Sequence, residues 1–169
     1  SGIIYNFALT QSRTCNETEL KRVIVSVIND LSTAQRVERT CRTLSEMGFD
    51  VTLVGRKKRD SSPLRQKPYD QHRMNLMFEK GPFFYAEFNI HLFFYLIFHR
   101  SDLLFSNDLD TLPANHLASR IKRIPVVFDS HENFTEVPEL AGRKRVRNTW
   151  KFFERKLFLR QKDIFTVNE

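Results

Sequence analysis

Runs of branched apolar residues alternate along the chain with segments in which apolar residues recur at helical spacing. The first run, residues 23–28, is apolar except for Ser26, as expected for a strand buried on both faces of a sheet. Apolar residues then keep helical spacing from Ala34 to Leu44, and residues 51–54 predict a second short strand that ends at Gly55. A strand, a helix and a strand of these lengths predict a crossover unit and therefore a parallel sheet.

Residues at the two ends of the first helix predict its bounds. Ser32 with Gln35 three positions later resembles a capping box, which would start the helix there. Gly48 follows the last apolar position of the periodic segment, where a glycine commonly ends a helix.

The alternation of strands and helices continues to the end of the chain without an internal repeat. We therefore expect an α/β fold, a doubly wound and mainly parallel Rossmann-like sheet with helices on both faces. The further elements are strands at 74–78, 103–105, 126–128 and 164–167, and helices at 83–98, from Pro113 onward, and at 143–160.

The length of 169 residues suits one domain. We expect polar residues 1–20 to form an N-terminal extension, with Ser1-Gly2 typical of a tag remnant, and residues 21–169 to form the domain. Because the chain ends on Asn168-Glu169 directly after a predicted strand, we expect it to be the first half of a longer polypeptide.

Phenylalanine is concentrated in one segment, residues 81–100, of a chain with 16 phenylalanines. Its apolar part carries Glu87, Asn89 and His91 and is shorter than the roughly 20 apolar residues that a membrane-spanning helix needs. We predict a helix packed on the sheet, with partial contact with lipid as the alternative.

Several chemistries are excluded by residues that the chain lacks. Its five glycines are scattered, so there is no glycine-rich phosphate loop, no dinucleotide fingerprint and no nucleophile elbow. A nicotinamide-dependent oxidoreductase is therefore not expected. Cys15 and Cys41 make neither a disulfide framework nor a zinc site, and Cys41 at an apolar helical position predicts a reduced thiol.

Polar segments follow three of the predicted strands, where ligands of parallel α/β sheets bind. One alternative is that these residues only cap the following helices, which would explain Ser32 and Thr111. It explains residues 129–132 less well, because no helix is predicted to begin there. The candidate site residues are Asn29, Asp30, Ser32 and Thr33 after the first strand, Asp108 and Asp110 after the fourth, and Asp129, His131 and Glu132 after the fifth.

His131 is the strongest candidate, because near neutral pH an imidazole can form a hydrogen bond to a ligand, accept a proton or ligate a metal. A single histidine is also common as a structural residue. The carboxylates around it would need to converge to hold a hard cation, and we expect no obligatory metal.

Positive charge is local in this chain, whose formal net charge is +7. Residues 56–73 form a basic loop, and residues 141–162 form a basic helix with opposed apolar and basic faces. Such a helix can lie on anionic lipid or on phosphate groups, or its basic face can simply be solvated. No motif for binding nucleic acid is present. The basic face is Lys144, Arg147, Lys151 and Arg155.

Five motifs follow one another in the chain: Asn29-Asp30-Leu31, Gln35-Arg36-Val37, residues 107–114 (NDLDTLPA), residues 128–132 (FDSHE), and Trp150 followed by residues 165–168 (FTVN). In this order they resemble the N-terminal domain of glycosyltransferase family 4, most closely its bacterial members of the Bacteroides type. The resemblance covers residues 21–169.

The resemblance implies a GT-B architecture, in which two Rossmann-like domains face a cleft. The N-terminal domain of that family holds mainly the acceptor, and a C-terminal domain absent from these residues would hold a UDP-sugar or GDP-sugar donor. Transfer in the family retains the anomeric configuration and usually needs no catalytic metal. Without its donor domain, this fragment is expected to be inactive and to need no cofactor of its own.

The resemblance also assigns roles to residues. His131 becomes the catalytic, acceptor-side histidine with Glu132 beside it, and Asp108 and Asp110 become cleft residues that, with Asp129, hold the acceptor. The first loop would approach the donor phosphates. It lacks the glycine pair of many family members, so its backbone approaches phosphate less easily.

We therefore expect the acceptor-binding domain of a retaining, nucleotide-sugar-dependent hexosyltransferase in cell-surface polysaccharide or glycolipid synthesis. Its acceptor would be a sugar or lipid-linked molecule, and nucleic acid would not be a partner. The expected location is the cytoplasm, peripherally on the inner face of the cytoplasmic membrane. The alternative is a non-enzymatic Rossmann-like module recruited to anionic membrane surfaces.

Overall fold

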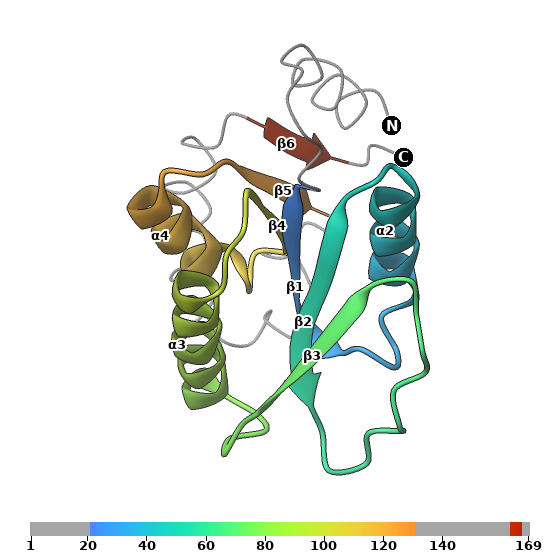
Figure 1. The fold of residues 1–169 in the computed structure, drawn as a ribbon. Helices are drawn as coiled ribbons and strands as arrows, with labels where there is room; N and C mark the ends of the chain where they lie inside the picture. Colours follow the sequence, from blue (N-terminus) through green and yellow to red (C-terminus); the bar gives the residue numbers. More distant parts are fainter. Residues whose placement is uncertain (1–20, 131–162, 167–169) are drawn as a thin grey trace, which may run out of the picture.

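The computed structural model describes residues 21–130 and 163–166, and their strands form one six-stranded sheet (Figure 1). The order is β3-β2-β1-β4-β5-β6, and every neighbouring pair is parallel. This order confirms the predicted doubly wound fold. The strands are β1 Arg22–Asp30, β2 Asp50–Lys57, β3 Asp70–Asn75, β4 Leu103–Asn107, β5 Val126–Ser130 and β6 Asp163–Thr166.

Helices cover both faces of the sheet, as predicted. Helix α2, Gln35–Glu46, lies on one face, and α3, Pro82–Phe98, lies with α4, Leu112–Lys122, on the other (Figure 1). Each face has its own apolar core, because alternate residues of β1 point to opposite sides: Val23, Val25 and Val27 pack toward α2, and Ile24 and Ile28 toward α3. The predicted helix at 143–160 and the extension at 1–20 lie outside the described residues.

The phenylalanine-rich segment is a helix that packs on the sheet, as predicted. Phe84, Phe88, Leu92 and Leu96 recur every four residues and are buried on one face of α3. Pro82 lies in the first turn, where a backbone N–H would have no acceptor within the helix, so the lack of this N–H in proline costs no hydrogen bond. Within the part of the chain that the structure describes, no helix is both long and apolar enough to cross a membrane.

The third strand was predicted in the wrong place. It covers Asp70–Asn75, beginning four residues earlier than expected, and pairs with residues 52–57 of β2. The chain leaves the sheet after Asn75 because the Glu87 carboxylate of α3 accepts hydrogen bonds from the backbone N–H groups of Met77 and Phe78, at 2.8 and 2.9 Å.

Gly55 lies inside β2 and does not end it, contrary to expectation. A Cβ atom at this position would lie 2.5 Å from the Leu31 side chain and 2.8 Å from the Asn29 carbonyl oxygen. The glycine therefore allows the end of β1 and its loop to lie directly against β2, which is a common reason for a glycine within a strand.

The predicted capping box is also wrong. Helix α2 begins at Gln35 after Ala34 and has no side-chain cap, because the Ser32 hydroxyl donates instead to the Asp30 carboxylate at 2.8 Å. Thr111 likewise does not cap α4, since its hydroxyl donates to the Asn107 carbonyl oxygen at 2.8 Å. The prediction for Gly48 is confirmed: it has a φ of 85° just after α2 and donates to the Ser45 carbonyl oxygen.

The Asp30 carboxylate joins three segments at the end of β1. It accepts hydrogen bonds from the Ser32 backbone and hydroxyl, from the Ser61 hydroxyl of the β2–β3 loop, and from Arg73 of β3 at 2.9 Å. Burial alone would raise the pKa of this group, which is 2 % exposed. The hydrogen bonds from Ser61 and Ser32 and the charge of Arg73 outweigh burial and lower the pKa to about 2.

Replacing Gly55 with alanine should lower the free energy of unfolding by about 2–3 kcal/mol, because the new methyl group meets backbone that cannot move aside. Gly48→Ala is the matched control. Nothing lies within 4 Å of its added Cβ, so its cost is the left-handed φ alone, about 1 kcal/mol. Denaturant unfolding measures both, and an equal cost for the two variants would contradict the contact argument.

Asp30→Asn should lower the free energy of unfolding at neutral pH by about 3 kcal/mol, because Arg73 would keep its burial and lose its charged partner. The native pKa lies below the ordinary value of 3.8, so this stabilisation is complete above pH 3.8 and is lost as the pH falls through about 2. Denaturant unfolding from neutral pH to about pH 2 measures the change. Asp50→Asn, at an exposed carboxylate, is the control, and a loss independent of pH would disprove the ion-pair argument.

Candidate functional site at the carboxyl edge of β1, β4 and β5

The strand order reverses between β1 and β4, which places the loops after these two strands side by side. Below the loops, the carboxyl ends of β1 and β4 are linked by polar side chains. Asn107 donates to the Ser26 carbonyl oxygen at 3.3 Å, and Asn115 of α4 donates to the Ser26 hydroxyl at 2.7 Å. These three residues are fully buried, so polar groups interrupt the apolar core at this end of the two strands.

Three buried oxygen atoms at the end of β4, in the loop after it and on α4 have no hydrogen-bond donor among the described residues. They belong to the side chains of Asn107, Asp110 and Asn115. A buried acceptor without a partner costs about 1–3 kcal/mol, so most are filled by protein, water or ligand. Their concentration around one loop and the helix after it distinguishes this part of the carboxyl edge.

The loop after β4 meets the end of β5, as the candidate residues predicted. Asp108 adopts a left-handed φ of 64°, and its backbone N–H donates to the Asp129 carbonyl oxygen at 3.0 Å. The Asp129 carboxylate lies 3.5 Å from the Arg36 guanidinium, which comes from the start of α2. The loop after β4, the end of β5 and the start of α2 thus come together at one edge of the sheet.

Asp110 is the most perturbed acid of this edge. Its residue is 5 % exposed, and burial, together with the nearby charge of Asp108, raises its pKa to about 7. The loop around it is held by Asn89 of α3, which donates to the Asp110 carbonyl oxygen at 2.8 Å and accepts from the Ala114 N–H at 3.2 Å. A fixed carboxyl group with a pKa near neutrality can exchange a proton or donate a hydrogen bond in its neutral form.

The four residues predicted to approach the donor phosphates lie at the end of β1 and in the turn after it. Asn29 is exposed, but the polar groups of the other three bind within this segment or to β3. Asp30 binds Arg73, Ser32 donates to Asp30, and the Thr33 hydroxyl donates to the Asp30 carbonyl oxygen at 3.0 Å. The turn therefore lies next to the candidate site, with little polar side chain left free toward it.

The other predicted site residues lie outside the described residues. They are His131 and Glu132 after β5, and the basic face formed by Lys144, Arg147, Lys151 and Arg155. In residues 21–130 and 163–166, no three histidine, cysteine, aspartate or glutamate side chains are placed to hold a metal ion. Cys41 is buried with a free thiol, and burial raises its pKa to about 12.

Five contributors to this edge were not among the candidate residues: Ser26 and Asn107 on the strands, and Arg36, Asn89 and Asn115 on the helices. The three helical residues reach the loops only through packing, so a search for polar residues directly after strands misses them. Asn89 did stand out as a polar residue in the apolar helix α3, where a half-buried amide indicates a specific hydrogen-bonding task.

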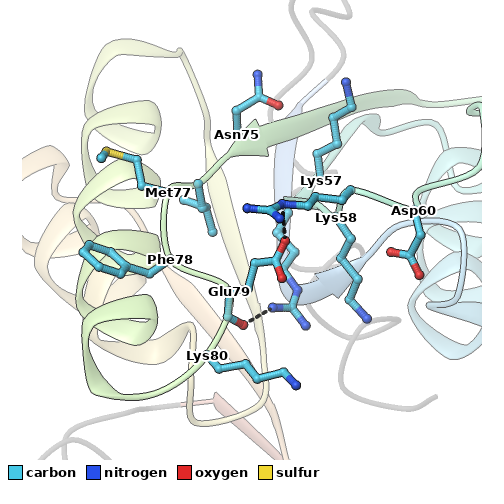
Figure 2. A pocket seen from close by; sticks show the side chains of 11 residues that line it. Lys57, Lys58, Asp60, Asn75, Met77, Phe78, Glu79 and Lys80 are labelled. Carbon is cyan, nitrogen blue, oxygen red and sulfur yellow. Dashed lines mark hydrogen bonds and ion pairs between the residues drawn. The ribbon is translucent and has the colours of Figure 1, made fainter.

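A pocket lies at the carboxyl ends of β2 and β3 (Figure 2). It has a volume of about 720 Å³ and is lined by residues 56–60 and 75–80, with five basic and two acidic side chains. Glu79 pairs with Arg59 at 3.1 Å and accepts from Arg56 through its carbonyl oxygen at 3.3 Å. Arg56 also lies over the Phe84 ring at 4.6 Å. Part of the basic loop predicted at 56–73 thus lines a positively charged pocket.

Comparisons with solved structures agree with the strand order. The chain is similar to sucrose-phosphate synthase from Thermosynechococcus elongatus, with a TM-score of 0.67 and 12 % identity over 88 % of this chain and 42 % of that one. It is also similar to MurG from Acinetobacter baumannii, with a TM-score of 0.50 and 12 % identity over 89 % of this chain and 44 % of that one. The chain spans less than half the length of these relatives, and at this identity the likeness concerns the fold.

The sequence itself carries the family assignment. No curated protein sequence matches the chain significantly. The model of the family described as Glycosyltransferase Family 4 matches residues 33–169, which is most of the chain. This match agrees with the Rossmann-like sheet described above, and the chain belongs to glycosyltransferase family 4.

Proposed function

We propose that this chain is the acceptor-binding domain of a glycosyltransferase that uses a nucleotide sugar, either a UDP-sugar or a GDP-sugar. The observation that carries the proposal is the Asp110 carboxyl group, 5 % exposed and with its pKa near neutrality, where the strand order reverses and side-chain oxygen atoms have no donor among the described residues. A sugar presents many hydroxyl groups, which can donate hydrogen bonds to a carboxyl group at this edge of the sheet. Family membership supports the same reaction class.

The proposed reaction is hexosyl transfer with retention. A hydroxyl oxygen of the acceptor forms a bond to the anomeric carbon, the bond from that carbon to the donor phosphate oxygen breaks, and the hydroxyl proton passes to the departing phosphate group. The donor would be held by a second domain. Asp110, with Asp108 and Asp129, would orient the acceptor, and His131 and Glu132 would complete the site from the segment after β5. No metal is required in this scheme.

The proposed setting is bacterial synthesis of cell-surface polysaccharide or glycolipid, at the inner face of the cytoplasmic membrane. A non-enzymatic module recruited to membranes is the second candidate. The family match favours the enzyme, because residues 33–169 are matched as a glycosyltransferase domain. The two functions differ in one direct measurement, sugar transfer by the full-length protein.

In the full-length enzyme, Asp110→Asn and His131→Ala should each raise the KM for the acceptor or lower kcat by about tenfold, the value of one hydrogen bond to a bound substrate. The KM for the nucleotide sugar should stay constant, because the donor is bound elsewhere. Asp50→Asn, at an exposed carboxylate at the start of β2, is the control. Unchanged transfer kinetics in both variants would disprove the assigned site.

The same Asp110→Asn substitution should stabilise the fold at mildly alkaline pH. The folded pKa of about 7 lies above the ordinary 3.8, so ionisation of the wild type opposes folding increasingly as the pH rises between these values. The gain in free energy of unfolding should be small near pH 4 and grow by up to about 1.4 kcal/mol per pH unit toward neutrality. Denaturant unfolding across that range measures it, and a variant less stable than wild type at pH 8 would contradict the burial argument.

A further inference from the structure

The outward face of α3 is apolar and exposed. Phe83, Ile90, Phe94 and Phe98 are 71 %, 55 %, 52 % and 77 % exposed, and their spacing places them on one side of the helix. The opposite side of the same helix is the buried row that packs on the sheet. A helix that is apolar on both sides is normally enclosed, so a large apolar face left in water indicates a binding surface.

The loop before α3 extends this face. Met77 is 85 % exposed and Phe78 47 %, and the Phe78 ring lies 5.7 Å from the Phe83 ring. The loop is held in place by the two hydrogen bonds from its backbone to Glu87, so both side chains are presented by a fixed backbone. The apolar stripe consists of Met77, Phe78, Phe83, Ile90, Phe94 and Phe98.

Positive charge lies at both ends of the apolar stripe. Met77 and Phe78 also line the basic pocket of Figure 2, where they lie to one side and Lys57, Lys58 and Lys80 to the other. These side chains therefore join the apolar stripe to a pocket with five basic and two acidic residues.

At the other end, Lys122 of α4 ties the two helices together. Its ammonium group donates to the carbonyl oxygens of Leu96 and His99 and to the Ser101 hydroxyl. This contact brings the end of α4, with exposed Arg120 and Arg123, next to exposed Arg100. The apolar stripe is thus bounded by basic residues at its beginning and at its end.

We propose that the apolar stripe docks on the surface of a bilayer that contains anionic phospholipid, with the basic pocket and Arg100 on the headgroup phosphates. A bilayer of this kind has an apolar interior beneath a negatively charged surface. The aromatic side chains of the stripe can enter the apolar layer while the basic residues at its two ends contact the charged headgroups. A second copy of this chain fits less well, because parallel and antiparallel pairing of two such stripes both bring basic ends together. This docking stands independently of the proposed sugar transfer.

The test is sedimentation of the full-length protein with two kinds of vesicles, phosphatidylcholine alone and phosphatidylcholine with about a third of phosphatidylglycerol. The protein should bind the anionic vesicles, and binding should weaken as salt rises. The double variant Phe94→Ser/Phe98→Ser should reduce binding about tenfold, because two exposed rings no longer enter the interface. Circular dichroism and denaturant unfolding should show an intact fold, since both side chains are solvent-facing.

A second variant tests the charges separately. Lys80→Glu/Arg100→Glu leaves every ring in place and should also reduce binding to anionic vesicles about tenfold. The controls are Leu64→Ser, an exposed apolar residue of the β2–β3 loop, and Arg39→Glu on α2 at the other face of the sheet, both of which should bind as wild type. Absence of wild-type binding at low salt, or binding as tight as wild type by both double variants, would overturn the proposal. The proposal would also be overturned if the wild-type protein bound no vesicles but formed a dimer in sedimentation velocity, and if the Phe94→Ser/Phe98→Ser variant abolished that dimer.

Discussion

The structure depends on β1 being enclosed on both faces and both edges. Its residues Val23 to Ile28 are all buried, β2 and β4 pair with its two edges, and α2 and α3 contribute to the cores on its two faces. Because β1 is the central strand, the connections run outward from it in both directions, and the strand order must reverse beside it. The loops after β1 and β4 therefore meet at one place, above the buried polar side chains of Ser26, Asn107 and Asn115.

The parts of the fold that follow from local pattern could be predicted from the sequence. The run at 23–28 indicated a doubly buried strand, and the apolar spacing between Ala34 and Leu44 placed α2 to within two residues. Position after a predicted strand was enough to place Asp108 and Asp129 at the same edge, because parallel strands have their carboxyl ends at one edge of the sheet. His131 stays a prediction, since it lies outside the described residues.

The features that could not be predicted all depend on partners distant in the chain. Ser32 lies in a sequence typical of a helix cap, yet its hydroxyl group donates to the carboxylate of Asp30, two residues earlier. That carboxylate is held by Arg73, which is 43 residues away in the chain. Gly55 looks like a strand end until the loop after β1 is seen to lie against it. Local sequence limits the conformations that a segment can adopt, and packing against segments distant in the chain determines which conformation forms.

Two departures from a consistent fold stand out among the described residues, and they lie in different places. Asp110 keeps an acid in a setting that opposes its charge, while α3 keeps aromatic side chains in water. Neither helps the domain to fold, and residues that oppose folding are expected at functional sites. The first departure lies where the strand order reverses and suits a small polar ligand. The second covers one side of a helix and suits an extended surface, so the proposed acceptor site and the proposed membrane surface use separate residues.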